Sequence, residues 1–447
     1  MNCARALAIV LAALAYAGAT QAVPLEVYGR LPKLEDVSIS PDGTKIAFVR
    51  TDGDTRIIAI VSHADRKTLK MIRVGKVKLR SVRWADDFRV MITTSETTLP
   101  WGLIGSEGEW RQMVIVDLRE SAPVQVPRLS ERDNRDLVNA ISGEPMVRML
   151  EGRTVLFVPG IYVSGQTLPC LVRYDLESGG QRVVRRGTAS IDRWLVDPNG
   201  KIIAEQDYDQ QDRRWRIRIA PDGSLADVAS GRELIDAPSM LGYGPTGDTL
   251  LTRFTENGDP VWKLLSLKDG SFVPFVEGRS LRWPIEDPYT HQMVGGVQFV
   301  DDEFHDVFFD NSRKKSWDAI VRAYGAADHV RFVSASTDFR KIIVLVEGAK
   351  MGYQYQLVDL EAGRTTQIGN VYEGIDTPLE VRRIVYPAAD GLEIQAYLAL
   401  PPGREPVARR GCRCWRRWSA FFERTIRRSR VRPLKFQQLR RYAAVGR

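Results

Sequence analysis

The sequence predicts an all-β chain that folds as a seven-bladed β-propeller, followed by a separate β-hairpin and a basic, unstructured tail. Three observations lead to this prediction. Short β-branched runs recur along the chain, and each flanks a turn built on Asp, Gly or Asn. The runs repeat at a near-constant spacing, and patterns typical of helices are almost absent.

The clearest repeat lies at residues 37–49, where alternating apolar residues stand on both sides of a Pro41-Asp42-Gly43 turn. This pattern predicts a β-hairpin. Related hairpins are expected at residues 81–92, 194–204, 241–251 and 332–345. The run at 155–158 is expected to pair with 171–176, and the unit after residues 296–300 is degenerate.

Seven units across residues 37–368 give about 47 residues each, which is close to the roughly 40–50 residues of a four-stranded propeller blade. A four-stranded unit cannot bury either of its faces alone, whereas radial stacking buries both. A tandem pair of β-sandwiches would also supply many short strands, but it would not predict the recurring turn at this spacing.

The N-terminus predicts a cleavable signal peptide over residues 1–22, because Arg5 precedes an uncharged apolar run at 6–17 and small residues continue to Ala22. The alternative is a membrane anchor, but the run is shorter than the roughly 20 residues that span a bilayer. A periplasmic or secreted protein is therefore expected. The further expected parts are a lead-in at 23–36, the propeller at 37–378, a linker and hairpin at 379–403, and the tail at 404–447.

The formal net charge of +8 comes from the tail. Residues 404–447 hold fourteen Arg and Lys435 against Glu405 and Glu423, a net charge of +13, which leaves −5 for residues 1–403. Clustered Arg could bind nucleic acid or anionic lipid. A secreted chain with an acidic main body favours neither, so no nucleic-acid partner and no stable membrane anchor are expected.

Cysteine and histidine give little support for a metal site. Cys3 would leave with the signal peptide, the Cys412-x-Cys414 pair has no histidine after it, and Cys170 is expected to be a small buried apolar residue. The densest set of potential ligands is Asp301, Asp302, Glu303, His305 and Asp306. We expect these residues to lie in a solvated loop between strands, so no metal site and no cofactor are predicted.

Eight tryptophans precede the hairpin, and they could either form a carbohydrate- or peptide-binding surface or fill the space between blades. The second role is the expected one, since a buried indole contributes a large apolar area and satisfies its N–H locally. The eight are Trp84, Trp101, Trp110, Trp194, Trp215, Trp262, Trp283 and Trp317.

Residues 382–387 and 392–400 flank an Asp390-Gly391 turn, which predicts one more hairpin beyond the last repeat. The hairpin contributes to a resemblance. The signal peptide leads directly into Ile-Ser-Pro-Asp-Gly-Thr-Lys-Ile-Ala-Phe at residues 39–48, a degenerate propeller follows, and Val-Tyr-Pro-Ala-Ala-Asp-Gly-Leu-Glu-Ile-Gln-Ala-Tyr-Leu stands at 385–398. Together these features resemble the prolyl oligopeptidase family, particularly its secreted bacterial dipeptidyl-peptidase and acylaminoacyl-peptidase types, over about residues 1–403.

The resemblance implies a propeller that restricts access to short peptides, placed before an α/β-hydrolase domain with a Gly-x-Ser-x-Gly elbow followed by Asp and His. This chain has no Gly-x-Ser-x-Gly, and its four histidines, His63, His291, His305 and His329, all precede the hairpin. We therefore expect no catalytic residue and no enzyme activity, and we interpret the Arg-rich tail as out-of-frame translation or a premature end of the gene.

Two functions follow from the sequence. The first is a truncated, non-catalytic remnant of a secreted serine peptidase, whose propeller would gate short peptides. The second is a free-standing periplasmic propeller that binds a peptide or protein partner. The hairpin at 382–400 favours the first function, because it makes sense as the beginning of another domain.

Overall fold

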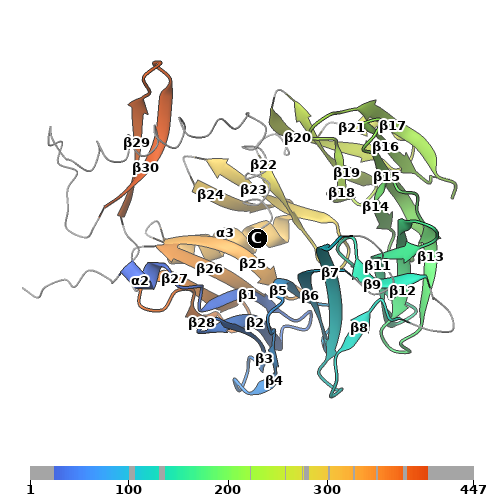
Figure 1. Ribbon diagram of the computed structural model, residues 1–447. Helices are drawn as coiled ribbons and strands as arrows, with labels where there is room; N and C mark the ends of the chain where they lie inside the picture. Colours follow the sequence, from blue (N-terminus) through green and yellow to red (C-terminus); the bar gives the residue numbers. More distant parts are fainter. Residues whose placement is uncertain are drawn as a thin grey trace, which may run out of the picture. The chain divides into compact units, whose positions relative to one another are not determined.

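The computed structural model (Figure 1) describes residues 25–99, 106–129, 136–221, 223–256, 258–273, 275, 281–300, 303–325, 328–348, 351–375 and 380–400. The predicted signal peptide and the Arg-rich tail lie outside these residues. The chain divides into one unit over Val23–Pro378 and a second unit to which the described residues 380–400 belong. A short helix, α2 (Leu25–Tyr28), precedes the first strand.

The first unit consists mainly of antiparallel sheets whose strands follow one another in chain order. The first sheet contains β1 (Leu34–Ile39), β2 (Lys45–Asp52), β3 (Thr55–Ser62) and β4 (Thr68–Arg73). The second sheet has nine strands: β5 (Lys78–Trp84), β6 (Arg89–Thr98), β7 (Gly108–Asp117), β8 (Val124–Val126), β9 (Leu137–Ile141), β10 (Met146–Leu150), β11 (Arg153–Val163), β12 (Thr167–Asp175) and β13 (Gln181–Arg186).

Four further sheets follow. The third contains β14 (Ile191–Val196), β15 (Ile202–Asp209), β16 (Arg214–Ile219) and β17 (Ala226–Arg232), and the fourth contains β18 (Ser239–Tyr243), β19 (Thr249–Glu256), β20 (Asp259–Ser266) and β21 (Phe272–Val273). The fifth contains β22 (Leu281–Glu286), β23 (Met293–Val300) and β24 (Glu303–Phe308), and the sixth contains β25 (Asp328–Ala335), β26 (Lys341–Gly348), β27 (Gly352–Asp359) and β28 (Arg364–Asn370).

This architecture confirms the predicted all-β, propeller-like fold. The hairpin expected at residues 37–49 is the β1–β2 pair, and residues 155–158 pair with 172–175 as the sequence predicts. In the nine-stranded sheet, β7 and β9 join two groups of strands through the Arg111–Ile141 pair. The number of seven blades stays a prediction.

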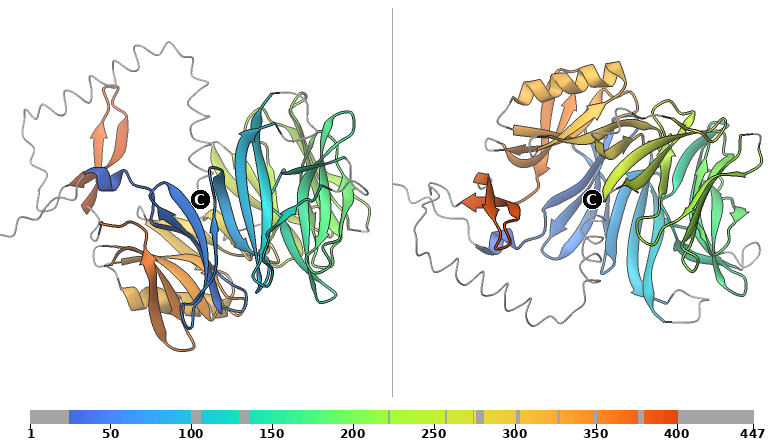
Figure 2. Two further views of the ribbon diagram at one scale, coloured as in Figure 1. Left: turned by 60° about the horizontal axis from the view of Figure 1, so that its bottom comes forward. Right: turned by 90° about the horizontal axis from the view of Figure 1, so that it is seen from above.

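One helix of the fold was not predicted from the sequence. Helix α3 (Asn311–Tyr324) follows β24 and packs against β24 and β25 (Figure 2), where it buries Trp317 and Ile320. The Asp310 side chain caps its first turn by accepting a hydrogen bond from the Arg313 backbone N–H at 2.9 Å. The degenerate unit of the sequence is therefore a three-stranded sheet followed by a helix.

The first and last sheets of this unit pack against each other. Ile39 and Ile46 share one buried apolar cluster with Ile343 and Leu357 of the last sheet. Between the two sheets, the Thr337 N–H donates to the Pro41 carbonyl at 2.9 Å. Burial of this shared apolar surface brings the two ends of the repeat series together.

A buried arginine connects three other sheets. Arg148 of β10 is 3% exposed. Its guanidinium donates to the carbonyls of Val147, Val196, Asp197 and Tyr289, the last at 2.8 Å. Desolvation lowers the pKa of Arg148, but an arginine remains charged in proteins. A desolvated cation is thus stabilised by carbonyl dipoles from the second, third and fifth sheets.

Tyr289, whose carbonyl accepts one of the Arg148 hydrogen bonds, lies in the β22–β23 turn. The Tyr289 side chain packs against the apolar cluster of the second sheet. Burial raises the pKa of its phenol, and the negative charges of Asp287, Asp87, Asp86 and Asp42 raise it further. The phenol is therefore neutral at ordinary pH, close to acidic turns of three different sheets.

The second unit contributes the hairpin of β29 (Glu380–Pro387) and β30 (Glu393–Leu400), drawn in orange-red in Figure 1. It turns at Asp390-Gly391 as the sequence predicts, with the Gly391 N–H donating to the Ala388 carbonyl at 3.0 Å. Val381, Val385, Leu392 and Tyr397 are exposed on it. Isolated two-stranded hairpins are marginally stable, and exposed apolar strands of this kind suit association.

Among the described residues, no helix is both long enough and apolar enough to span a bilayer.

Replacing Arg148 by Met should destabilise the chain by about 3 kcal/mol, because several buried carbonyls lose their donor at once. Urea unfolding of the full chain measures this change. Arg340→Met is the matched control, since the Arg340 side chain is 60% exposed and its loss should cost less than about 0.5 kcal/mol. Equal losses in the two variants would contradict the role assigned to Arg148.

The carboxyl group of Asp42, in the turn of the first hairpin, should make the stability of the fold depend on pH in the acidic range. Burial raises the pKa of Asp42, but hydrogen bonds from Ser40, Thr44 and Lys45 outweigh burial and lower it from 3.8 to about 2. A carboxyl with a depressed pKa stabilises the fold above its unfolded pKa, and this contribution is lost as the pH falls from about 4 to about 2.

Asp42→Asn should therefore lower the free energy of unfolding by roughly 1 kcal/mol at pH 7, a value reduced for solvent screening. The difference from the native chain should shrink as the pH approaches the folded pKa. Urea titrations between pH 7 and pH 3 measure it, and a difference that does not change with pH would speak against the assignment.

Candidate functional site

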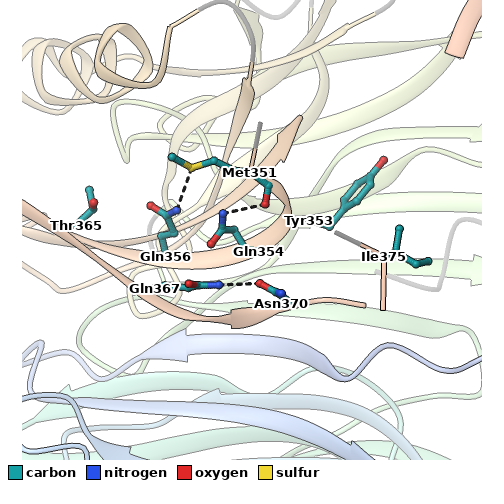
Figure 3. A pocket seen from close by; sticks show the side chains of 8 residues that line it. All are labelled: Met351, Tyr353, Gln354, Gln356, Thr365, Gln367, Asn370 and Ile375. Carbon is teal, nitrogen blue, oxygen red and sulfur yellow. Dashed lines mark hydrogen bonds between the residues drawn. The ribbon is translucent and has the colours of Figure 1, made fainter. Parts of the chain in front are cut away.

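A polar groove of about 470 Å³ lies along β27 and β28 of the last sheet (Figure 3). Its volume falls within the roughly 300–1,000 Å³ of ordinary ligand pockets. The residues that line it are uncharged: Met351, Tyr353, Gln354, Gln356, Thr365, Gln367, Asn370 and Ile375.

The strand period explains why carboxamides line this groove. Gln354, Gln356 and Val358 alternate along β27, so their side chains share one face of the sheet. Val358 joins the apolar cluster around Trp317, whereas the two glutamines line the groove. One face of β27 therefore contributes to the apolar core at Val358 and to the groove at Gln354 and Gln356.

Register places the carboxamides in cross-strand pairs. Gln354 stands opposite Asn370, and Gln356 stands opposite Gln367. Side chains directly opposite each other on antiparallel strands are close neighbours. Two pairs of carboxamides, two residues apart along β27, therefore form the floor of the groove.

Hydrogen bonds fix the orientation of the inner glutamines. Gln356 Oε1 accepts from the Tyr324 hydroxyl of α3 at 2.5 Å, and Gln354 Nε2 donates to the Met351 carbonyl at 2.9 Å. Both glutamines are less than 10% exposed. Burial raises the pKa of Tyr324 to about 12, so its hydroxyl keeps the donated proton at neutral pH.

The outer carboxamides keep free hydrogen-bonding atoms. Gln367 Nε2 donates to Asn370 Oδ1 at 2.7 Å, and both side chains are exposed. Within the described part of the chain, Gln367 Oε1, Asn370 Nδ2 and Gln354 Oε1 make no hydrogen bond. One donor group and two acceptors of the groove lining are therefore available for hydrogen bonds.

The acidic set singled out in the sequence was expected to lie in a solvated loop. Asp301 and Asp302 lie outside the described residues. The loop prediction is wrong for Glu303 and His305, which lie in strand β24, although both side chains are about half exposed. Glu303 Oε1 lies 3.0 Å from His329 Nε2. Asp306 corrects the prediction: it is buried in β24, where it accepts hydrogen bonds from the Arg331 guanidinium and the Phe332 N–H.

No group of His, Cys, Asp and Glu among the described residues has the arrangement of a metal site. Burial is the main cause that lowers the pKa of His63. Over the described ranges, no serine hydroxyl is hydrogen-bonded to any histidine. Cys170 is fully buried as predicted, and burial raises the pKa of its thiol to about 12.

The prediction that tryptophans fill the core is confirmed for five of them: Trp84, Trp194, Trp215, Trp262 and Trp317 are buried. It is wrong for Trp283, which is 52% exposed and contacts Phe304 at a ring distance of 5.1 Å. A register shift in β22 between Leu281 and Trp283 marks this position, and a bulge re-aims side chains. Trp110 is partly buried and packs against a small apolar cluster of the second sheet, and Trp101 lies outside the described residues.

The groove carboxamides were not predicted from the sequence. One signal was available, because Gly-Tyr-Gln-Tyr-Gln-Leu at residues 352–357 places polar residues at every second position of a strand. Such alternation shows that the glutamines share a face. It does not show that the face borders a cavity.

Searches with family models and among curated proteins found no match. Solved structures do match. The acylaminoacyl peptidase of Pyrococcus horikoshii is 16% identical, with 83% of this chain and 51% of that chain covered and a TM-score of 0.33. A puromycin-hydrolyzing peptidase of Mycobacterium tuberculosis is 12% identical, with 85% and 60% covered and a TM-score of 0.47.

Both of these structural neighbours are peptidases. A mutant puromycin hydrolase in complex with PGG is a further one, with 12% identity, 86% and 61% covered and a TM-score of 0.48. These neighbours belong to the prolyl oligopeptidase family, the family of the predicted resemblance, and they cover the propeller-like part of the chain. The chain covers 51–61% of their length, and similarity at this level does not extend to a shared activity.

Proposed function

We propose that this protein binds short peptides in the groove of β27 and β28 and does not hydrolyse them. The two cross-strand carboxamide pairs are the observation that carries this proposal. Each carboxamide has both a donor and an acceptor, as a peptide group does. Residues two apart in a strand are separated by about 6.5–7 Å, which is also the repeat of alternate residues in an extended peptide.

The uncharged lining restricts the class of ligand. A charged side chain that enters the groove would lose hydration without gaining an opposite charge. Main-chain amides and uncharged polar side chains would exchange hydrogen bonds with water for hydrogen bonds with carboxamides. The groove therefore favours peptides with Gln, Asn, Ser or Thr over strongly charged ones.

This function fits both hypotheses drawn from the sequence. In a protein of the resembled family, a peptide-binding propeller would restrict which substrates reach a hydrolase domain; a free-standing propeller would use the same groove to hold a partner. The predicted β29–β30 hairpin favours the first. The absence of a Gly-x-Ser-x-Gly motif from the sequence supports binding without hydrolysis.

Replacing Gln367 and Asn370 by Ala should weaken peptide binding by the full chain about tenfold, since this corresponds to roughly 1.4 kcal/mol of hydrogen bonding. Fluorescence anisotropy with a fluorescein-labelled Thr-Gln-Thr-Gln-Thr-Gln peptide measures the affinity. Mass spectrometry of the recovered peptide should show it intact.

Gln166→Ala, at an exposed position of the β11–β12 turn, is the matched control and should bind as the native chain does. Cleaved peptide would overturn the non-catalytic part of the proposal. Equal affinity of the native chain and the Gln367/Asn370 variant would remove the groove from the proposal.

A further inference from the structure

The last sheet ends in an unpaired strand. Its order is β25-β26-β27-β28, so among the described strands β28 pairs only with β27. We propose that the peptide adds to the outer edge of β28 as a fifth strand of this sheet. This inference rests on the proposed function and specifies the ligand as an extended chain held by main-chain hydrogen bonds.

Charge and length together distinguish β28 from the other described outer strands of the first unit. Proteins protect exposed edges with charged side chains or very short strands. The β4 edge carries Lys70 and Arg73, β17 carries Asp227 and Arg232, and β13 carries three arginines. The β21 edge has two residues. β28 begins with Arg364 but carries no charge from Thr365 to Asn370, so among the described outer strands it offers the longest uncharged edge to another strand.

Backbone alternation shows which groups the edge offers. The Val371 N–H points inward, because it donates to the Tyr353 carbonyl at 2.8 Å. Successive residues of a strand direct their backbone groups to opposite sides. The N–H and C=O of Asn370 therefore point away from β27, toward the position of an added strand.

Side chains and backbone then act together at one place. Gln367 and Asn370 belong to this edge strand and also line the groove. An added strand would place alternate side chains opposite them, about 4.5–5.5 Å away between Cβ atoms. We therefore assign the ligand to peptides with uncharged polar residues at alternate positions. A second copy of this chain, paired edge to edge through β28, is the competing occupant.

N-methylation of the probe peptide tests strand addition directly. Two versions of the Thr-Gln-Thr-Gln-Thr-Gln probe carry N-methyl groups on either the even-numbered or the odd-numbered amides. In an added strand, one set of amides faces β28 and the other faces solvent. One version should therefore bind the full chain at least about tenfold more weakly than the parent peptide, while the other keeps most of its affinity.

The experiment distinguishes failure of strand addition from failure of the proposed function. If the parent peptide binds and both methylated versions bind equally well, strand addition is wrong while the proposed function stands. If the parent peptide does not bind at all, the proposed function itself fails. Sedimentation measures the oligomeric state of the chain during these experiments. If the peptide binds only after a dimer has dissociated, the edge is occupied by a second copy instead.

A pair of variants separates the side chain from the backbone. Asn370→Ala removes only the carboxamide, whereas Asn370→Pro also removes the outward N–H, a change that an edge strand tolerates. Asn370→Pro should bind the probe more weakly than Asn370→Ala, with thermal unfolding confirming that both variants fold. Equal affinities of the two would count against a main-chain bond at this position.

Discussion

The buried guanidinium of Arg148 is the interaction on which the arrangement of the first unit most depends. It stabilises carbonyls from β10, from the end of β14 and from the β22–β23 turn. An unpaired cation at such a site would be costly, so these segments must remain together for the charge to be solvated by the protein. Apolar packing between sheets is non-directional, whereas this contact is specific in distance and direction. It fixes which turn lies beside which sheet.

The same logic explains why the last sheet can support a binding site. Strands β26 and β27 pack against the first sheet through Ile343 and Leu357, and β26 packs against α3 through Ile342 and Val344. This apolar packing anchors the sheet, so the groove face of β27 and β28 can carry polar residues at low cost to stability. The Tyr324 hydroxyl of α3 holds Gln356 in one orientation, so helix packing contributes to the preorganisation of the groove.

The sequence predicted the hairpins because their turns carry strong local signals. Pro41-Asp42-Gly43 and Asp390-Gly391 favour tight turns through residues that adopt them readily, and the structure forms both. Helix α3 was missed although Trp317, Ile320 and Tyr324 have helical spacing and Asp310 is a suitable cap. The repeating strands before this segment led us to expect strands there as well, whereas its local pattern indicates a helix.

Other features depend on contacts that no local pattern contains. Arg148 lies in a short run that resembles any half-buried strand, and three of its four partners lie 48 to 141 positions later in the chain. Trp283 is exposed because of a local register shift in β22. The glutamines of β27 alternate as a strand requires, yet whether they meet a core or a groove is decided by where α3 and β28 end.

Amide hydrogen exchange of the full chain, with and without the Thr-Gln-Thr-Gln-Thr-Gln peptide, tests the central claim most directly. The account predicts slower exchange at residues 365–370 when the peptide is bound, because outward N–H groups become hydrogen-bonded, with the edges β4, β13 and β17 unchanged. Protection confined to another edge, or bound peptide with no protection along β28, would contradict it.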